Sequence, residues 1–178
     1  MRFIVGFITA LALLAFGGAI YFYSGQFDIA ASTPHNAFEQ QVLRTAMELM
    51  VVAKASGVRE PPPFTDELIK DGFEHYDEMC ITCHGGPGLE RSEIGKGLNP
   101  QAPLLSAAVK SWSSRQLFWI VKHGVKMTGM PSFGATHNDQ EVWSMVAFIE
   151  QLPGMSAEQY QQLKRHAPTD GHNHMTHD

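Results

Sequence analysis

The chain has 178 residues, enough for one ordinary domain and an appendage. Its 13 Lys and Arg against 18 Asp and Glu give a formal net charge of -5, which argues against nucleic-acid binding and favours a protein partner. The two cysteines stand three positions apart, so the sequence contains no pattern of a disulfide-stapled domain.

Residues 3–23, FIVGFITALALLAFGGAIYFY, form an almost wholly apolar stretch. About 20 residues with a rise of about 1.5 Å each cross a hydrocarbon core of roughly 30 Å, so this stretch has the length of a membrane span. The small residues 17–19 suit signal-peptide cleavage, but four apolar or aromatic residues follow them, which favours a retained transmembrane anchor over 1–27. Arg2, the one charge in that segment, favours an N-terminus in the cytoplasm and the rest of the chain outside it.

The next segment, residues 28–63, is predicted to hold an amphipathic helix and a connector. Thr33 and Pro34 suit an N-cap and a first helical position, and apolar residues then recur at spacings of three and four, so we predict a helix over 34–56. Its apolar stripe favours packing against the neighbouring domain over a cofactor site. The three prolines at 61–63 form a stiff connector and mark the domain boundary.

Residues 64–155 are predicted to form one helical domain. Thr65 caps a first helix that runs into the cysteine motif, and a glycine- and proline-rich irregular stretch follows over 85–112. Capping-box spacings at 113–116 and 138–141 open two further helices. No segment alternates apolar and polar residues over a strand length, so the predicted fold class is all-α.

The end of the chain, residues 156–178, is predicted to be a short helix from Ser156 and a His-rich tail. Four tail side chains are able to ligate a metal ion: His172, His174, Met175 and His177. Such a tract can bind copper or zinc weakly. A disordered solubilising tail is the interpretation that its polar composition favours.

The motif Cys80-Ile81-Thr82-Cys83-His84 is typical of covalent haem attachment. On one helical turn, two thiols can reach the two vinyl groups of a haem while the following histidine faces the iron. A zinc site would need more nitrogen or sulfur ligands than stand nearby, and a thioredoxin-like redox pair would need a βαβ setting. We therefore predict one haem c, attached through Cys80 and Cys83, with His84 as an iron ligand.

Six residues around this motif keep a wider spacing: Gly72, Tyr76, Cys80, Cys83, His84 and Gly85. The pattern resembles the first helix of the class I monohaem cytochromes c, and the resemblance covers about residues 64–152. It implies the class I cytochrome c fold around one covalent haem, here preceded by the anchor and the amphipathic helix. It also implies that the glycine and the tyrosine pack against an aromatic residue of the C-terminal helix, a role for Phe148 with Trp143 beside it.

The resemblance implies a methionine as the second axial ligand, in a motif that stands here as Met130-Pro131-Ser132-Phe133. A thioether is neutral and soft, and it raises the reduction potential above that of a haem with two histidines. Pro131 restricts Met130 to an extended backbone, which suits a loop. Met127 is the competing candidate, and most methionines are only core filler.

The resemblance further implies a proline carbonyl that accepts a hydrogen bond from the proximal histidine. Pro103, followed by Leu104, resembles that proline, and Pro100 is the alternative. Such a bond orients the imidazole and raises its basicity as a ligand. Leu104, Trp119 and Phe133 are candidates for the apolar wall of the haem, with ordinary core packing as the alternative.

Three cations, Arg91, Lys96 and Lys122, are candidates for pairing with the haem propionates. A solvated surface position is the favoured interpretation for each of them, because most surface charges have no specific partner.

The leading functional hypothesis is a single-electron carrier, not an enzyme, because an iron with two protein ligands has no open position for a substrate. The resemblance implies a bacterial respiratory chain, with the anchor in the inner (cytoplasmic) membrane, the haem domain on the periplasmic side and membrane redox complexes as partners. A second hypothesis is a cytochrome subunit of a membrane oxidase or dehydrogenase, with the helix over 34–56 as the docking surface. A third, an open-site haem sensor or peroxidase, requires that Met130 does not bind the iron.

Overall fold

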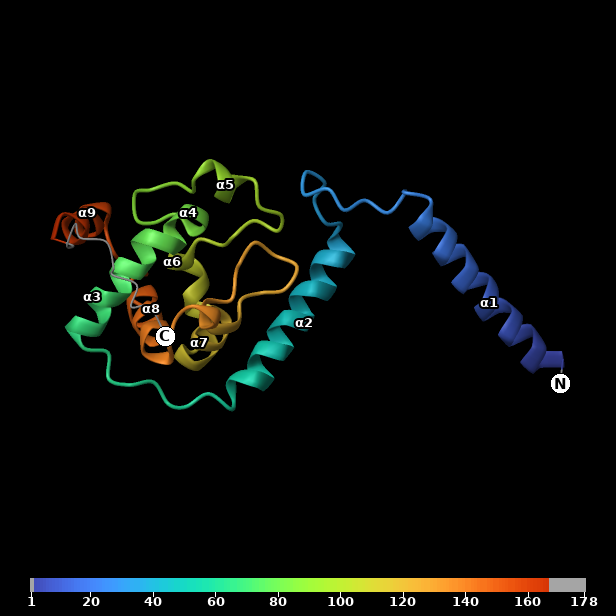
Figure 1. Cartoon of the computed structure of the whole chain (residues 1–178), viewed down its shortest axis with the longest axis horizontal. Coiled ribbons are helices and arrows are strands. Elements are labelled where there is room, and N and C mark those ends of the chain that lie inside the picture. The colour runs from blue at the N-terminus through green and yellow to red at the C-terminus, as the bar shows by residue number, and fades with distance from the viewer. Residues whose placement is uncertain (1, 167–178) are drawn as a thin grey trace, which may run out of the picture. The chain divides into compact units, whose positions relative to one another are not determined.

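The computed structural model describes residues 2–166, and every regular element among them is a helix (Figure 1). The predicted all-α fold class is confirmed, since residues 2–166 contain no strand and only an isolated antiparallel bridge between Gly86 and Leu89. The chain divides into two compact units, Met1–Pro34 and His35–Asp178.

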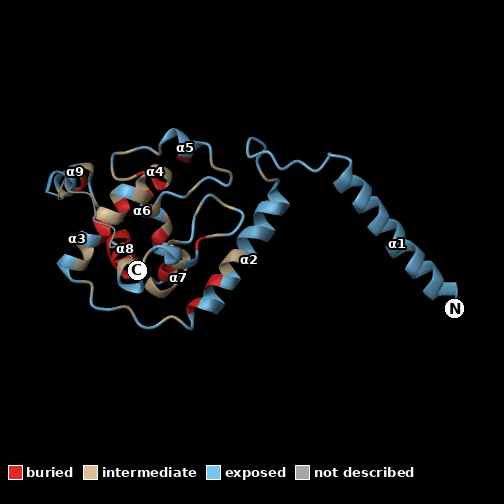
Figure 2. Cartoon of the chain, in the orientation of Figure 1, coloured by how far each residue is buried: buried red, intermediate tan, exposed pale blue. Residues whose placement is uncertain are grey.

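The first unit contains the helix α1 (Arg2–Tyr23), and all of its residues are exposed (Figure 2). The most apolar 18-residue window of α1 has a mean hydropathy of 2.4. A fully exposed apolar helix of 22 residues is stable in a lipid bilayer and not in water. Helix α1 is therefore a candidate single-pass membrane anchor, although signal sequences share this length and composition.

Helix α2 (Ala37–Ala55) opens the second unit and begins three residues later than predicted. Its N-cap is Asn36, not Thr33, because Asn36 and Glu39 form a complete capping box. The amide of Glu39 donates to Asn36 Oδ1 over 2.9 Å, and the amide of Asn36 donates to Glu39 Oε2 over 3.0 Å. This reciprocal pair satisfies two amides that would otherwise lack partners, which the Thr33-Pro34 pair cannot do.

Two sides of α2 carry apolar residues. The helix lies against α7 (Ser114–His123), and its buried residues are Val51 and Ala55. A separate stripe is exposed, with Phe38 at 77 % and Leu49 at 67 % relative exposure. We call this the outer stripe, and its members, spaced by four, seven and three residues, are Phe38, Val42, Leu49 and Val52. The predicted packing surface is thus only one of two apolar faces.

The remaining helices pack around the cysteine motif and form the domain that is predicted to hold the haem. In chain order they are α3 (Asp66–His75), η1 (Tyr76–Cys80), α4 (Ile81–His84), α5 (Glu93–Lys96), α6 (Leu105–Ala108), η2 (Val109–Ser111), α7, η3 (Phe133–Ala135), α8 (Asp139–Ile149) and α9 (Ala157–His166). The cap at Thr65 and the capping boxes at 113–116 and 138–141 are confirmed. The stretch 85–112 is wrongly predicted as wholly irregular, because local caps such as Ser92 Oγ with the amide of Gly95 support short helices there.

The core forms where α3 and α8 lie side by side (Figure 1). A Cβ atom on Gly72 would overlap the main-chain oxygen of Ser144 and come within 2.9 Å of the Cβ of Phe148, so only glycine allows this approach. The Tyr76 ring lies 5.2 Å from the Phe148 ring, as the family resemblance implies. Trp143 instead stacks on Phe118 of α7, with 4.3 Å between ring centroids.

Helix α9, predicted from Ser156 onward, shares this core. The Tyr160 ring is fully buried and lies 5.3 Å from the Phe73 ring. Its hydroxyl donates to Asp77 Oδ1 over 2.9 Å, and Lys164 Nζ pairs with the other carboxylate oxygen of Asp77 over 2.9 Å. Tyr160 and Lys164 therefore fasten the last helix to the segment that leads into the cysteine motif.

Candidate functional site

A turn of π-helix, η1, leads directly into the cysteine motif. Its closing bond runs from the amide of Ile81 to the carbonyl of Tyr76, five residues earlier. Single π turns inside α-helices recur at functional sites, because the extra residue rotates the side chains that follow. The motif continues as α4 and ends at Gly85, whose φ of 67° favours glycine. The thiols and His84 are thereby fixed on one short helical segment.

The two thiols have different surroundings and are not joined as a disulfide. Cys80 is buried, and burial, followed by the proximity of Cys83, raises its pKa to about 12. A thiol with so high a pKa stays protonated at neutral pH, which does not suit a thiolate redox pair. Within residues 2–166, no group of three or more His, Cys, Asp or Glu side chains is placed to hold a metal ion.

His84 is 9 % exposed, and its Nδ1 lies 2.8 Å from the carbonyl oxygen of Pro103. Because a carbonyl only accepts, Nδ1 carries the proton and Nε2 keeps its lone pair. Burial is the largest influence and lowers the pKa of His84, the bond to Pro103 opposes this, and nearby Arg91 lowers the pKa further. A neutral imidazole with Nδ1 so bonded is the form that ligates a metal. Pro103, not Pro100, makes this bond.

A cavity of about 470 Å³ lies beside His84. Leu104, half exposed, contributes to its wall, and the Tyr76 hydroxyl donates a 2.5 Å hydrogen bond to the carbonyl of Gly85. Burial raises the pKa of Tyr76, so its hydroxyl stays a neutral donor. The lining consists of Tyr76, His84, residues 85–91, Lys96, residues 104–106 and Leu152.

Met130 and Met127 stand in contrasting environments. Met130 is half-buried and packs against the core, whereas Met127 is 72 % exposed and has a φ of 63°. The loop is closed by the amide of Val125, which donates to the carbonyl of Met130 over 3.3 Å. The hydroxyl of Thr128 donates to the carbonyl of Val125 over 2.7 Å and accepts from the amide of Met130 over 3.1 Å. These hydrogen bonds fix the backbone at Met130, whereas the Met127 side chain is exposed. Met130 is therefore the better candidate for an iron ligand.

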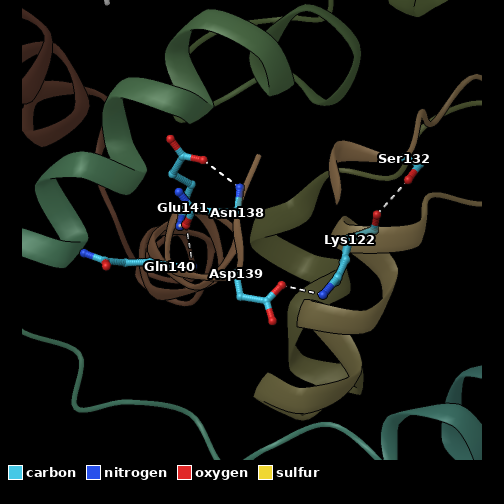
Figure 3. A network of polar contacts seen from close by, with 6 residues as sticks. All are labelled: Lys122, Ser132, Asn138, Asp139, Gln140 and Glu141. Atoms are coloured by element: carbon cyan, nitrogen blue, oxygen red, sulfur yellow. Dashed lines mark hydrogen bonds and ion pairs between the residues drawn. The ribbon is translucent and has the colours of Figure 1, made fainter. Parts of the chain in front are cut away.

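The residues after Met130 are tied to the end of α7 (Figure 3). Ser132 Oγ donates to the carbonyl of Lys122 over 2.8 Å, and Lys122 Nζ pairs with Asp139 at the start of α8. Gly124 has a φ of 66°, and a Cβ there would lie 2.5 Å from the carbonyl oxygen of Pro131. The Met130-Pro131 segment is therefore pressed against α7 at a position that requires glycine.

The structure does not bring all the predicted wall residues to the cavity beside His84. Met130 and Phe133 pack against the core but are not in that cavity lining, and the Phe133 ring lies 5.7 Å from the His137 ring. Trp119 lines a different cavity of about 760 Å³, together with Trp143, and lies 4.7 Å from the His123 ring. The places of Trp119 and Phe133 in a haem wall stay predictions.

Arg91 corrects the sequence interpretation. It is half-buried, not solvated, and its Nε is enclosed without a hydrogen-bond partner. The sequence names Arg91 as a propionate candidate but does not show its burial, because nothing local indicates that α5 folds back onto α4. Lys96 and Lys122 instead pair with Glu90 and Asp139.

The donor set fits a covalently attached haem. Two thiols and a neutral histidine stand on one short helical segment, and a cavity of mixed polar and apolar lining adjoins them. The enclosed Nε of Arg91 lacks an acceptor, which a haem propionate could supply. The metal-binding tract predicted at His172, His174, Met175 and His177 lies outside the described residues.

Residues 67–149 match a protein-family model described as cytochrome C oxidase, cbb3-type, subunit III. The matched segment begins inside α3 and ends with the last residue of α8, so it contains the cysteine motif, Pro103 and Met130. A comparison with curated proteins found no match.

Proposed function

We propose that this chain, which belongs to the class I monohaem c-type cytochromes, carries single electrons at the inner membrane of a bacterium. Members of the family bind one haem c covalently, and when bound this group takes up and returns one electron at its iron. The proposal rests on the setting of His84. This histidine directly follows the second thiol, is buried, and has its Nδ1 bonded to the carbonyl of Pro103.

Each residue of the site has a role in this proposal. Cys80 and Cys83 attach the haem, and His84 supplies Nε2 as one axial ligand. Met130 supplies the other, which its partly buried, hydrogen-bonded position supports. Two protein ligands leave no coordination position open to a substrate, so the chain acts as a carrier and not as an enzyme.

The membrane location rests on α1. Its 22 exposed, apolar residues suit a retained single-pass anchor. Arg2 at its start favours a cytoplasmic N-terminus, which puts the haem domain on the periplasmic side. Membrane-bound redox complexes of a respiratory chain are then the partners within reach.

A second candidate function is a cytochrome subunit of a larger oxidase or dehydrogenase. The matching family model is described as an oxidase subunit, and the outer stripe of α2 is exposed apolar surface of the kind that marks protein contacts. Electron transfer by the haem domain is common to both candidates.

The proposal is tested by measuring whether the full chain attaches haem covalently and whether the iron has two protein ligands. The denatured, reduced protein in alkaline pyridine should give a c-type haem spectrum, and haem should stay with the polypeptide through acid-acetone extraction. Cys80→Ala with Cys83→Ala should release it. Haem that leaves the wild-type chain would refute the proposal, and ready carbon monoxide binding by the native ferrous protein would favour a sensor or peroxidase.

A further inference from the structure

Arg91 stands out among the cations at the cavity beside His84. Its Nε is fully enclosed and has no hydrogen-bond partner, and Arg91 takes part in none of the ion pairs formed within residues 2–166. Lys96, the other cation of the cavity lining, pairs with Glu90 over 2.6 Å and is more than half exposed. Arg91 is therefore an uncompensated charge in a place where water does not reach its Nε.

The position of Arg91 is fixed to the cysteine motif by close backbone contacts. A Cβ on Gly85 would lie 3.3 Å from the amide nitrogen of Arg91. The next residue, Ser92, donates from its amide and its hydroxyl to the carbonyl of Thr82, over 3.0 and 2.9 Å. A Cβ on Gly95 would lie 3.1 Å from the Cβ of Arg91 and 2.9 Å from the Cα of Cys83. The backbone that carries the guanidinium is thus packed against the turn that carries both thiols and His84.

The enclosed Nε–H of Arg91 needs an acceptor, because a buried donor without one is unfavourable, and an anion would also pair the charge of the guanidinium. Its planar fork of N–H donors matches a carboxylate better than a lysine ammonium does. The described residues supply no carboxylate to Arg91, whereas a haem carries two at its edge. A positive charge beside a bound haem would also disfavour the oxidised iron, which is one unit more positive, and so would raise the reduction potential.

We infer that Arg91 binds a haem propionate in the cavity beside His84 and raises the reduction potential of the iron. The inference rests on the proposed function, since it requires haem attached at Cys80 and Cys83. Arg91 acts here as a positioning and charge-setting residue and touches neither the iron nor an electron partner.

The test compares Arg91→Gln, Arg91→Lys and the control Lys96→Gln in the full, haem-loaded chain in detergent. Redox titration gives the midpoint potential, and redox-difference infrared spectra report the carboxylate bands of the propionates. Arg91→Gln should lower the potential and shift a propionate band. Arg91→Lys should keep most of the potential, since it keeps the charge, but should shift the same band, since it loses the fork. Lys96→Gln should resemble wild type in both.

An unchanged potential and unchanged bands in Arg91→Gln would overturn the inference, and so would an equal fall of the potential in Lys96→Gln. If Arg91→Gln yields no stable holoprotein, the band position in Arg91→Lys decides, because an unshifted band excludes the guanidinium contact. A wild-type chain without covalent haem would instead be a failure of the proposed function, seen in the pyridine spectrum before any variant is made.

Discussion

The main-chain oxygen of Ser144 occupies the space that a Cβ atom on Gly72 would take. The contact brings the backbones of α3 and α8 together and allows Tyr76 and Phe148 to meet, just before the cysteine motif begins.

Gly72→Ala should therefore destabilise the protein, although alanine is the better helix former by about 1 kcal/mol. Overpacking of a tight core costs about 1–3 kcal/mol, and here the obstacle is backbone that cannot rotate away. Denaturant unfolding followed by circular dichroism should show the loss. Gly57→Ala is the control, because a Cβ there meets only Lys54 O at an ordinary 3.7 Å. Equal stability of the two variants would contradict the close α3–α8 crossing.

Met130→Ala should abolish the weak red-edge charge-transfer band of a ferric His/Met haem, lower the reduction potential and open the iron to carbon monoxide. Met127→Ala should leave all three nearly unchanged, because Met127 is exposed while Met130 packs against the core. Optical spectra and redox titration of both variants provide the comparison. The opposite pattern would invert the ligand assignment.

Tyr160→Phe should make the protein less stable at neutral pH by about 1 kcal/mol, since it removes the hydrogen bond to Asp77. The substitution should also make the free energy of unfolding less dependent on pH above pH 10. Burial, with the Asp77 charge next in size, raises the pKa of Tyr160 above its usual value near 10. The folded state then keeps a proton that the unfolded state releases, so stability is complete below about pH 10 and falls as the pH rises further.

Thermal unfolding between pH 8 and 11 tests this expectation. Wild type should lose stability more steeply than Tyr160→Phe above pH 10, and part of the slope should remain because burial also raises the pKa of Tyr76. Identical slopes would show that Tyr160 ionises alike in the folded and unfolded states.

The full chain should stay in the membrane fraction after washes with high salt and at alkaline pH, because an apolar helix as long as α1 does not leave a bilayer under those conditions. Fractionation and N-terminal sequencing of the mature protein check this. Recovery of a soluble form that begins near Ile20 would identify the segment as a signal peptide and leave the electron-carrier proposal intact.

Substitutions in the outer stripe separate a free carrier from a complex subunit. Leu49→Gln with Val52→Gln should leave the unfolding midpoint nearly unchanged, because both side chains are exposed. If the chain is a subunit, the same pair should reduce its co-purification with a membrane complex. Arg44→Gln is a matched control on the same helix, exposed and paired only with Glu48. Unaltered migration of all variants as a lone protein would favour the free carrier.

Hydrogen bonds between residues close in the sequence could be predicted from the sequence, and contacts between distant residues could not. The capping boxes at 113–116 and 138–141 follow from side chains three residues apart, and both form. At the start of α2 two local signals compete, and the reciprocal bonds of Asn36 and Glu39 prevail over Thr33-Pro34. His84 and Pro103 are 19 residues apart, so their bond was predictable only from the family resemblance. Arg91 shows the limit most clearly, because its enclosure depends on how α5 packs against α4.

The fastening of the Met130 loop to α7 has a kinetic consequence. Ser132 holds the carbonyl of Lys122, and Pro131 presses against Gly124, so the backbone on the C-terminal side of Met130 has little room to shift. On the other side, Thr128 bonds the amide of Met130 itself. If Met130 is the axial ligand that we propose, a backbone held on both sides of it would shift little between ferric and ferrous iron, which would keep the reorganisation energy of electron exchange small.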